Sequence, residues 1–236
     1  MHALPQNRHP LRRWRYLVTA ALLLLLSACA LSSSAKEERL VQLQQHVAAG
    51  EAAWQAHDYG AARSAYVQAR FLSPADASLA FRLGYVDEKL GNYADAASVY
   101  RDALKVAGIP VELQHDLTYR LALLEAFRLH GEAQVPRLLA TLPPTSAYAA
   151  DLQAVLALLA GDGRKALAAL NQARILPLSQ ELSSIILYHA ARAYHLTGEV
   201  DRALQNLYEA INRAEYAPIS KDIAEFKEFL LRQPRP

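Results

Sequence analysis

The sequence is poor in sulfur, in glycine and in β-branched residues. It contains one Cys, one Met and 9 Gly in 236 residues. β-Sandwiches, barrels and doubly wound sheets need many β-branched residues in their strands and glycines in their turns, so the composition argues against these architectures. In their place stand 45 Ala and 40 Leu, two strong helix formers that together make up more than a third of the chain. The composition predicts an all-α protein.

Acidic residues are absent from the first 28 positions, where Arg8, Arg12, Arg13 and Arg15 precede the apolar run Leu17–Leu26. That run is too short to span a bilayer comfortably. A basic region followed by a short apolar region is typical of a secretion signal. We therefore treat this part of the sequence separately from the fold.

The only cysteine of the chain ends the segment Leu26–Cys29, which reads Leu-Ser-Ala-Cys. This segment resembles the lipobox of bacterial lipoproteins, in which the chain is cut before the cysteine and the thiol is lipidated. The resemblance implies a signal peptide over 1–28, a lipid on Cys29, and a lipidated N-terminus with a flexible tether over 29–38. Ala30, and not Asp, follows the cysteine, which by analogy favours the periplasmic face of the outer membrane. An ordinary secretion signal and a single inner-membrane anchor are the alternatives.

Removal of residues 1–28 would leave 21 basic and 23 acidic side chains, a net charge of −2. With Cys29 converted to a thioether, the mature chain has no thiol for a disulfide, a thiolate metal site or a nucleophile. A slightly acidic chain also lacks the basic face that binding of nucleic acid requires. The expected partners are therefore proteins, and the membrane through the lipid, but not nucleic acid.

The mature chain contains an internal repeat of 34 residues, which relates the ranges 50–74 and 84–108. Small residues and tyrosines recur at this spacing. The matched pairs are Gly50 and Gly84, Tyr59 and Tyr93, Ala62 and Ala96, Tyr66 and Tyr100, Ala69 and Ala103, and Pro74 and Gly108. Small residues let two helices approach closely, and tyrosines fill the space between hairpins.

This pattern resembles the tetratricopeptide repeat (TPR), a helix–turn–helix unit of 34 residues whose helices are called A and B. The segments 81–84 (Phe-Arg-Leu-Gly) and 90–96 (Leu-Gly-Asn-Tyr-Ala-Asp-Ala) follow the family pattern, and weaker copies recur around Ala166 and Ala203. The resemblance implies a TPR-like α-solenoid of about five helical hairpins over 39–217.

The third repeat and the C-terminal end depart from the pattern. Pro136 lies within the expected second helix of the third repeat, and Pro143 follows, so this helix is expected to be short or displaced. Apolar residues at spacings of three and four over 219–232 predict one more helix. In the region 218–236 it would act as a capping helix that covers the apolar face of the last hairpin.

No catalytic or metal-binding motif is found in the sequence. G-x-S-x-G, HExxH, P-loop and GxGxxG motifs are absent. His189 and His195 lie six positions apart and so face different sides of a helix. The adjacent acids Asp87 and Glu88 diverge around their helix and are expected on the solvated surface. The sequence predicts a protein that is not an enzyme and that binds no cofactor or metal.

The TPR resemblance also implies a binding surface, because fixed positions of helix A form the concave wall in that family. Here these positions hold aromatic and arginine side chains, which suit a peptide ligand. The candidate partner-binding residues are Trp54, Phe81, Arg82, Tyr85, Glu88, Tyr119, Arg120, Phe127, Tyr188 and Arg192, with Glu51 and His189 on the same wall. The alternative is that the rings pack against the next hairpin and the arginines only aid solubility.

Arg82 and Arg120 occupy equivalent positions in consecutive hairpins, so their guanidinium groups are expected to form a ladder that binds a partner. Reversal of both charges is expected to abolish partner capture and to leave the helicity unchanged. Val47, Glu51 and Asp116 stand where chaperone-binding relatives have the Lys and Asn of a carboxylate clamp. An acidic C-terminal tail bound in that family's manner is therefore not expected.

Together these features predict a membrane-anchored periplasmic TPR scaffold lipoprotein. It would bind envelope proteins through peptide segments in its concave groove, in pilus or secretin assembly or in recruitment of peptidoglycan enzymes. The anchor would raise the effective concentration of these partners at the membrane. The alternative is a soluble or inner-membrane-anchored periplasmic binding module or chaperone. An enzyme would need a further cluster of convergent polar residues.

Overall fold

The computed structural model describes residues 34–213 and 218–233, and in these ranges every regular element is a helix. The first helix is helical over residues 34–55 and is followed by α2 (Tyr59–Leu72), α3 (Ala77–Leu90), α4 (Tyr93–Ala103), α5 (Val111–Phe127), η1 (Glu132–Gln134), α6 (Val135–Leu139), α7 (Ala147–Leu159), α8 (Gly163–Arg174), α9 (Gln180–Leu196), α10 (Val200–Ile211) and α11 (Ser220–Leu231). The predicted all-α class is confirmed. The signal peptide, Cys29 and residues 30–33 lie outside the described ranges, within which no helix is long and apolar enough to cross a membrane.

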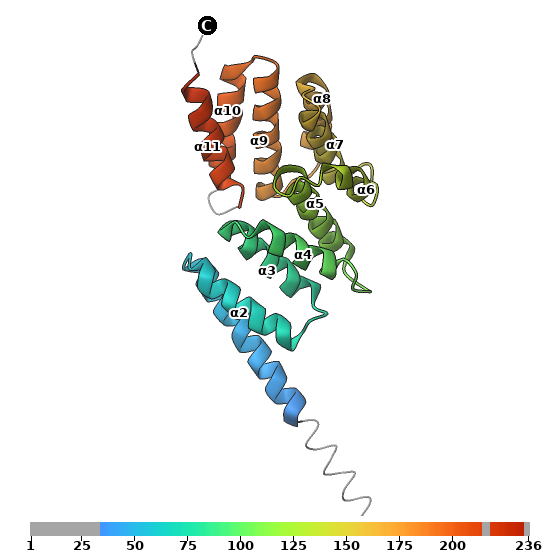
Figure 1. The fold of residues 1–236 in the computed structure, drawn as a ribbon, viewed down its shortest axis with the longest axis vertical. Coiled ribbons are helices and arrows are strands. Elements are labelled where there is room, and N and C mark those ends of the chain that lie inside the picture. Colours follow the sequence, from blue (N-terminus) through green and yellow to red (C-terminus); the bar gives the residue numbers. More distant parts are fainter. Residues whose placement is uncertain (1–33, 214–217, 234–236) are drawn as a thin grey trace, which may run out of the picture.

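The helices form hairpins that stack in chain order (Figure 1). The first helix pairs with α2, α3 with α4, α5 with η1 and α6, α7 with α8, and α9 with α10. The hydrophobic clusters run from each hairpin into the next, so no hairpin has a core of its own. This is the predicted solenoid of five hairpins, with α11 as the capping helix.

Small residues form the close contacts between helices, as the repeat predicts. The aligned alanines are all 0% exposed, and they are Ala62, Ala96, Ala166 and Ala203. A Cβ atom on Gly84 would lie 2.3 Å from Cε1 of Tyr100, and one on Gly50 would lie 2.6 Å from Cε1 of Tyr66. Each tyrosine therefore packs directly on the backbone of the partner helix, and only glycine leaves room for the ring.

Each hairpin reverses direction at one residue with a left-handed backbone. Gly91, Gly161 and Gly198 have φ values of 80°, 74° and 81°. His57 and His130 take the equivalent places in the first and third hairpins, with φ values of 59° and 53°. Glycine adopts this conformation without strain, whereas a residue with a side chain is less favourable there. The two histidines are therefore turn residues.

The third hairpin has a short second helix, which confirms the expectation from Pro136. The chain forms a 3₁₀ turn, η1, and then the five-residue helix α6, in which Pro136 lies at the start. Proline has no backbone N–H to donate, and this absence is tolerated in the first turn of a helix. Val135 and Leu142, which are 0% and 5% exposed, anchor the segment in the core.

Helix α11 caps the last hairpin and also reaches back towards the first half of the solenoid. Ile223 and Leu230 are 0% and 1% exposed and pack in the cluster that α9 and α10 form. At the N-terminal end of the helix, Nζ of Lys89 donates a hydrogen bond to Oγ of Ser220 at 3.3 Å. Arg128, just after α5, forms an ion pair with Asp222. The capping prediction is confirmed, and the link to α3 and α5 adds a second function for this helix.

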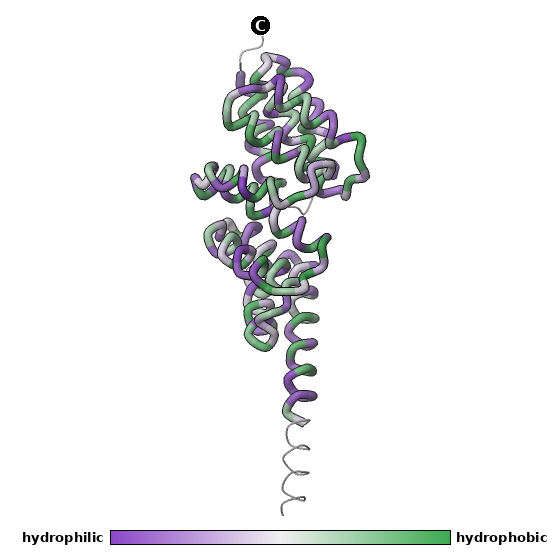
Figure 2. The backbone as a smooth tube through the Cα atoms, turned by 90° about the vertical axis from the view of Figure 1, so that its right-hand side faces the viewer, coloured by the Kyte–Doolittle hydropathy of each residue, from purple (hydrophilic) through white to green (hydrophobic). Residues whose placement is uncertain are grey.

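The first helix extends beyond its hairpin, with hydrophilic and hydrophobic residues alternating along it (Figure 2). Leu40 and Val41 on this extension are 53% and 50% exposed. Residues 34–38, expected to belong to a flexible tether, are helical and continue this helix. The lysine and glutamates of this segment are good helix formers, which agrees with the observed structure.

Candidate functional site

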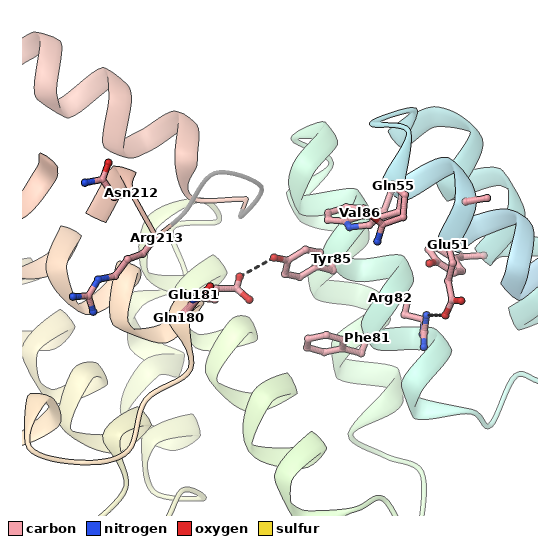
Figure 3. A pocket seen from close by; sticks show the side chains of 13 residues that line it. Glu51, Gln55, Phe81, Arg82, Tyr85, Val86, Gln180, Glu181, Asn212 and Arg213 are labelled. Atoms are coloured by element: carbon pink, nitrogen blue, oxygen red, sulfur yellow. Dashed lines mark hydrogen bonds and ion pairs between the residues drawn. The ribbon is translucent and has the colours of Figure 1, made fainter. Parts of the chain in front are cut away.

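The inner side of the solenoid contains a groove of about 780 Å³ between the first two hairpins and the ends of α9 and α10, which we call the outer groove (Figure 3). Its lining residues are Glu51, Ala52, Trp54, Gln55, Tyr66, Phe81, Arg82, Tyr85, Val86, Gln180, Glu181, Asn212 and Arg213. The structure thus brings together four residues of the predicted partner-binding set, namely Trp54, Phe81, Arg82 and Tyr85.

Three aromatic rings form one wall of the outer groove. The ring centroids of Trp54 and Tyr85 lie 5.2 Å apart, and those of Phe81 and Tyr85 lie 6.0 Å apart in a stacked arrangement. Tyr59 extends the cluster behind Trp54 at 5.1 Å. Mutual packing restricts the side chains, so this wall offers a large apolar area at a low cost in conformational entropy on binding.

Glu181, in the first turn of α9, divides the inner side of the solenoid into two compartments. The hydroxyl of Tyr85 donates a hydrogen bond to Oε1 of Glu181 at 3.0 Å across the groove (Figure 3). Arg120 on α5 forms an ion pair with the same carboxylate. These contacts join α3, α5 and α9, and they separate the outer groove from a cavity that lies deeper in the solenoid.

Arg120 is buried at the centre of this polar network. Its Nη1 lies 3.1 and 3.2 Å from the two carboxylate oxygens of Glu88, and its guanidinium carbon lies 4.3 Å from the ring centroid of Tyr85. Tyr100 donates a further hydrogen bond to Glu88 at 2.6 Å. Burial raises the pKa of the Glu88 carboxyl, against the effect of Arg120. Burial alone would lower the pKa of Arg120, but the carboxylates of Glu88 and Glu181 raise it well above its usual value.

The expectation that Asp87 and Glu88 lie on the solvated surface is wrong. Asp87 is 0% exposed and accepts a hydrogen bond from Nε of Arg63 at 2.6 Å. The two acids do diverge around α3, but this helix is covered on both sides. Asp87 therefore meets an arginine from the preceding hairpin, and Glu88 meets Arg120 from the following one.

Arg82 also has an intramolecular partner, because it forms an ion pair with Glu51 of the first helix. The side chains of Arg82 and Glu51 are 41% and 50% exposed, so this pair lies at the rim of the outer groove. Each guanidinium group of the expected ladder is thus paired with a carboxylate from the preceding helix A. To bind a carboxylate of a partner protein, Arg82 or Arg120 would first have to break its ion pair within this chain.

Tyr119 does not reach the groove, although it belongs to the predicted set. It is 3% exposed, and its hydroxyl donates a hydrogen bond to Oδ2 of Asp151 on α7 at 2.6 Å. Nδ1 of His189 on α9 lies 2.9 Å from both carboxylate oxygens of Asp151. The three side chains link three successive A helices inside the core. For Tyr119 this agrees with the alternative interpretation, in which the ring packs against the next hairpin and does not bind a partner.

The remaining predicted residues line the deeper compartment, a cavity of about 410 Å³ that we call the inner cavity. Its lining residues are Glu88, Tyr93, Arg120, Leu123, Leu124, Phe127, Arg128, Glu181, Ile185, Tyr188, His189, Arg192, Pro218, Ile219, Asp222 and Phe226. The predicted wall is thus divided between two sites, with Phe127, Tyr188 and Arg192 assigned to the inner one.

Sequence reasoning missed the far wall of the outer groove, which Gln180, Glu181, Asn212 and Arg213 form. No local motif marks these positions, since they oppose Tyr85 only because of the path of the whole solenoid. A signal for the internal pairs does exist in the sequence. Glu51 and Arg82 are separated by 31 residues, and Glu88 and Arg120 by 32 residues. Both separations are close to the length of one repeat.

Within residues 34–213 and 218–233, no group of three or more His, Cys, Asp or Glu side chains is arranged to hold a metal ion. The buried His189 and Asp151 are instead bound to each other, as described above.

No protein-family model and no curated protein sequence matches the chain. Among solved structures, the chain is similar to a tetratricopeptide repeat protein from Parabacteroides merdae, with a TM-score of 0.58 and 15% identity over 96% of this chain and 87% of that one. It is also similar to a thermophilic TPR protein in Thermus thermophilus, with a TM-score of 0.55 and 21% identity over 81% of this chain and 100% of that one. At these identities the likeness shows the fold, which is a TPR-like helical repeat.

Proposed function

We propose that the protein is a non-enzymatic interaction scaffold that binds an extended peptide segment of a partner protein in the outer groove. The observation that carries the proposal is the composition of the groove. Phe81 and Tyr85, with Trp54 packed against Tyr85, form a ring wall that stands opposite a polar wall (Figure 3). Rings provide buried area for apolar side chains of a ligand, and such residues often dominate the energy of an interface.

Amide side chains in the outer groove support a peptide as the ligand. Gln55, Gln180 and Asn212 are exposed and form no side-chain hydrogen bond with another residue in the described part of the chain. An amide group offers both a donor and an acceptor, which match the N–H and C=O groups of an extended backbone. Recognition would thus combine backbone contacts from the amides with side-chain contacts from the rings.

Selection from a random peptide library against the full chain tests this site. Peptides that bind the unaltered protein should lose at least tenfold in affinity when Trp54 is replaced by Ala, because the ring wall loses its largest member. Replacement of Phe71, which is 80% exposed on α2 and does not line the groove, is the matched control. Equal losses in both variants, or selected peptides that do not depend on Trp54, would contradict the proposal.

We further propose that the scaffold acts at the bacterial cell envelope. The lipobox-like segment that ends at Cys29 supports cleavage after residue 28 and lipidation, and Ala30 supports the periplasmic face of the outer membrane. Anchored in this way, the groove would concentrate partners at the membrane during pilus or secretin assembly or recruitment of peptidoglycan enzymes. A soluble or inner-membrane-anchored binding module is the alternative.

Metabolic labelling with a fatty acid tests the anchor separately from the groove. The unaltered chain should incorporate label and fractionate with the outer membrane, whereas Cys29→Ser should remain unlabelled because it lacks the thiol. Cys29 is the only cysteine, so the substitution removes every possible thioether. Absence of label in the unaltered chain would remove the lipid anchor and leave the peptide-binding proposal intact.

A further inference from the structure

The inner cavity is distinct from the outer groove and is lined mainly by α5, α9 and α11, with Glu88 of α3 and Tyr93 of α4. Phe127 contributes from α5, Tyr188 and Arg192 from α9, and Phe226 from α11. Glu181 separates it from the outer groove, as described above. Its volume of about 410 Å³ lies in the range of sites that hold small organic molecules.

Arg192 differs from the other arginines that line this cavity. Arg120 is neutralised by Glu88 and Glu181, and Arg128 by Asp222. Arg192 forms no ion pair with any residue in the described ranges. Its guanidinium carbon lies 4.5 Å from the ring centroid of Phe127 and 5.9 Å from that of Tyr188, so two aromatic faces position the charge. Among the described residues that line the cavity, Arg192 is therefore the one arginine without an ion-pair partner.

His189, which also lines the cavity, has a polar atom without a partner. His189 is 0% exposed, and its Nδ1 lies 2.9 Å from Asp151, but its Nε2 is buried without a hydrogen bond within the described structure. A buried polar atom without a partner is uncommon and costs free energy. The rings of His189 and Phe127 have centroids 5.6 Å apart, and Phe127 also contacts Arg192. His189 and Arg192 thus both contact Phe127, and they lie three positions apart on α9.

We propose that the inner cavity is a second binding site, whose ligand is a small aromatic carboxylic acid. The carboxylate pairs with Arg192, whose planar fork of donors matches a carboxylate in two-point contact. A hydroxyl group of the ligand would donate a hydrogen bond to Nε2 of His189, an atom that the side-chain packing of this structure covers. The ring of the ligand packs among Phe127, Tyr188 and Phe226, where the wall is apolar. This proposal does not depend on peptide binding in the outer groove.

The test uses 3-phenyllactate as the probe, because it carries a ring, a carboxylate and a hydroxyl group. The full chain is placed in lipid nanodiscs, and binding is measured by calorimetry and by ligand-observed NMR, with empty nanodiscs as the blank. We expect 3-phenyllactate to bind at least tenfold more tightly than its neutral amide. Arg192→Gln should abolish this preference and Arg192→Lys should retain part of it. Arg202→Gln should leave it unchanged, because Arg202 is an exposed residue of α10 outside the cavity.

Equal binding of the acid and the amide would overturn the proposal, and so would an unchanged preference in Arg192→Gln. Circular dichroism of the variants checks that the helices are retained. The tripeptide Ala-Ala-Phe, with its C-terminus free or amidated, distinguishes a free acid from the end of a polypeptide. If the free tripeptide binds more tightly than the amidated one through Arg192, while phenyllactate and its amide bind equally, the assignment to a small acid is overturned.

Discussion

Replacement of Arg120 by Met should lower the free energy of unfolding by about 3–5 kcal/mol, the usual effect of removing one partner from a buried ion pair. The side chain of Arg120 is 8% exposed and is paired with Glu88, which is 12% exposed, and with Glu181. Its loss leaves two carboxylates close together without a cation. Urea unfolding of the full chain, followed by circular dichroism, measures the change.

Arg82 provides a matched control, because it occupies the equivalent position in the preceding hairpin and is also paired with a glutamate. This pair is exposed at the rim of the groove, so Arg82→Met should cost less than about 1 kcal/mol. Addition of Glu88→Gln and Glu181→Gln to Arg120→Met should recover much of the lost stability, because the unpaired charges are then gone. Two results would show that the lost stability does not come from the buried network. One is a similar loss of unfolding free energy in Arg82→Met and Arg120→Met, and the other is no recovery in the triple variant.

The same network changes the interpretation of a double charge reversal at Arg82 and Arg120. The sequence suggested that this change would leave the helicity intact and remove only partner binding. With a glutamate at position 120, three carboxylates would meet in a buried site. The fold around α3, α5 and α9 would be lost together with the groove, so the double reversal cannot separate binding from stability.

The hairpins could be predicted from the sequence because the information that defines them is local. Gly84 and Tyr100 lie within one repeat, and the residues that bury them recur at a fixed spacing. The short helix of the third hairpin was also predictable, since Pro136 constrains its own backbone. The helices of these hairpins are determined by the spacing of small and aromatic residues and by single prolines, and both can be identified directly in the sequence.

The division of the inner side into two sites could not be predicted in this way. It depends on a contact between Tyr85 and Glu181, which are separated by 96 residues. Whether they meet is determined by the small rotation between successive hairpins, which accumulates over the solenoid. The repeat pattern indicates that a side chain faces inward, but not whether the opposite wall lies within reach. For this reason Arg120 was expected to be free and is instead buried.

Replacement of Gly84 by Ala should have a comparably large effect, because it links the packing of a hairpin to the buried network. The new Cβ would lie 2.3 Å from Cε1 and 2.6 Å from Cζ of Tyr100, a fully buried ring that must then move. Overpacking of this kind costs about 1–3 kcal/mol. Displacement of the ring also withdraws the hydroxyl from Glu88, and an unsatisfied buried group adds about 1–3 kcal/mol.

A double-mutant cycle with Tyr100→Leu separates the clash from a general intolerance of alanine at this position. The shorter side chain relieves the clash, so the double variant should be about as stable as Tyr100→Leu alone, and the two effects should not add. Gly50→Ala is the control for an equivalent contact, with Cβ at 2.6 Å from Cε1 of Tyr66, in the terminal hairpin. Its effect should be smaller, because a terminal hairpin has only one neighbour to destabilise. Urea unfolding measures all four variants, and additive losses in the cycle would show that Gly84 acts through something other than the ring of Tyr100.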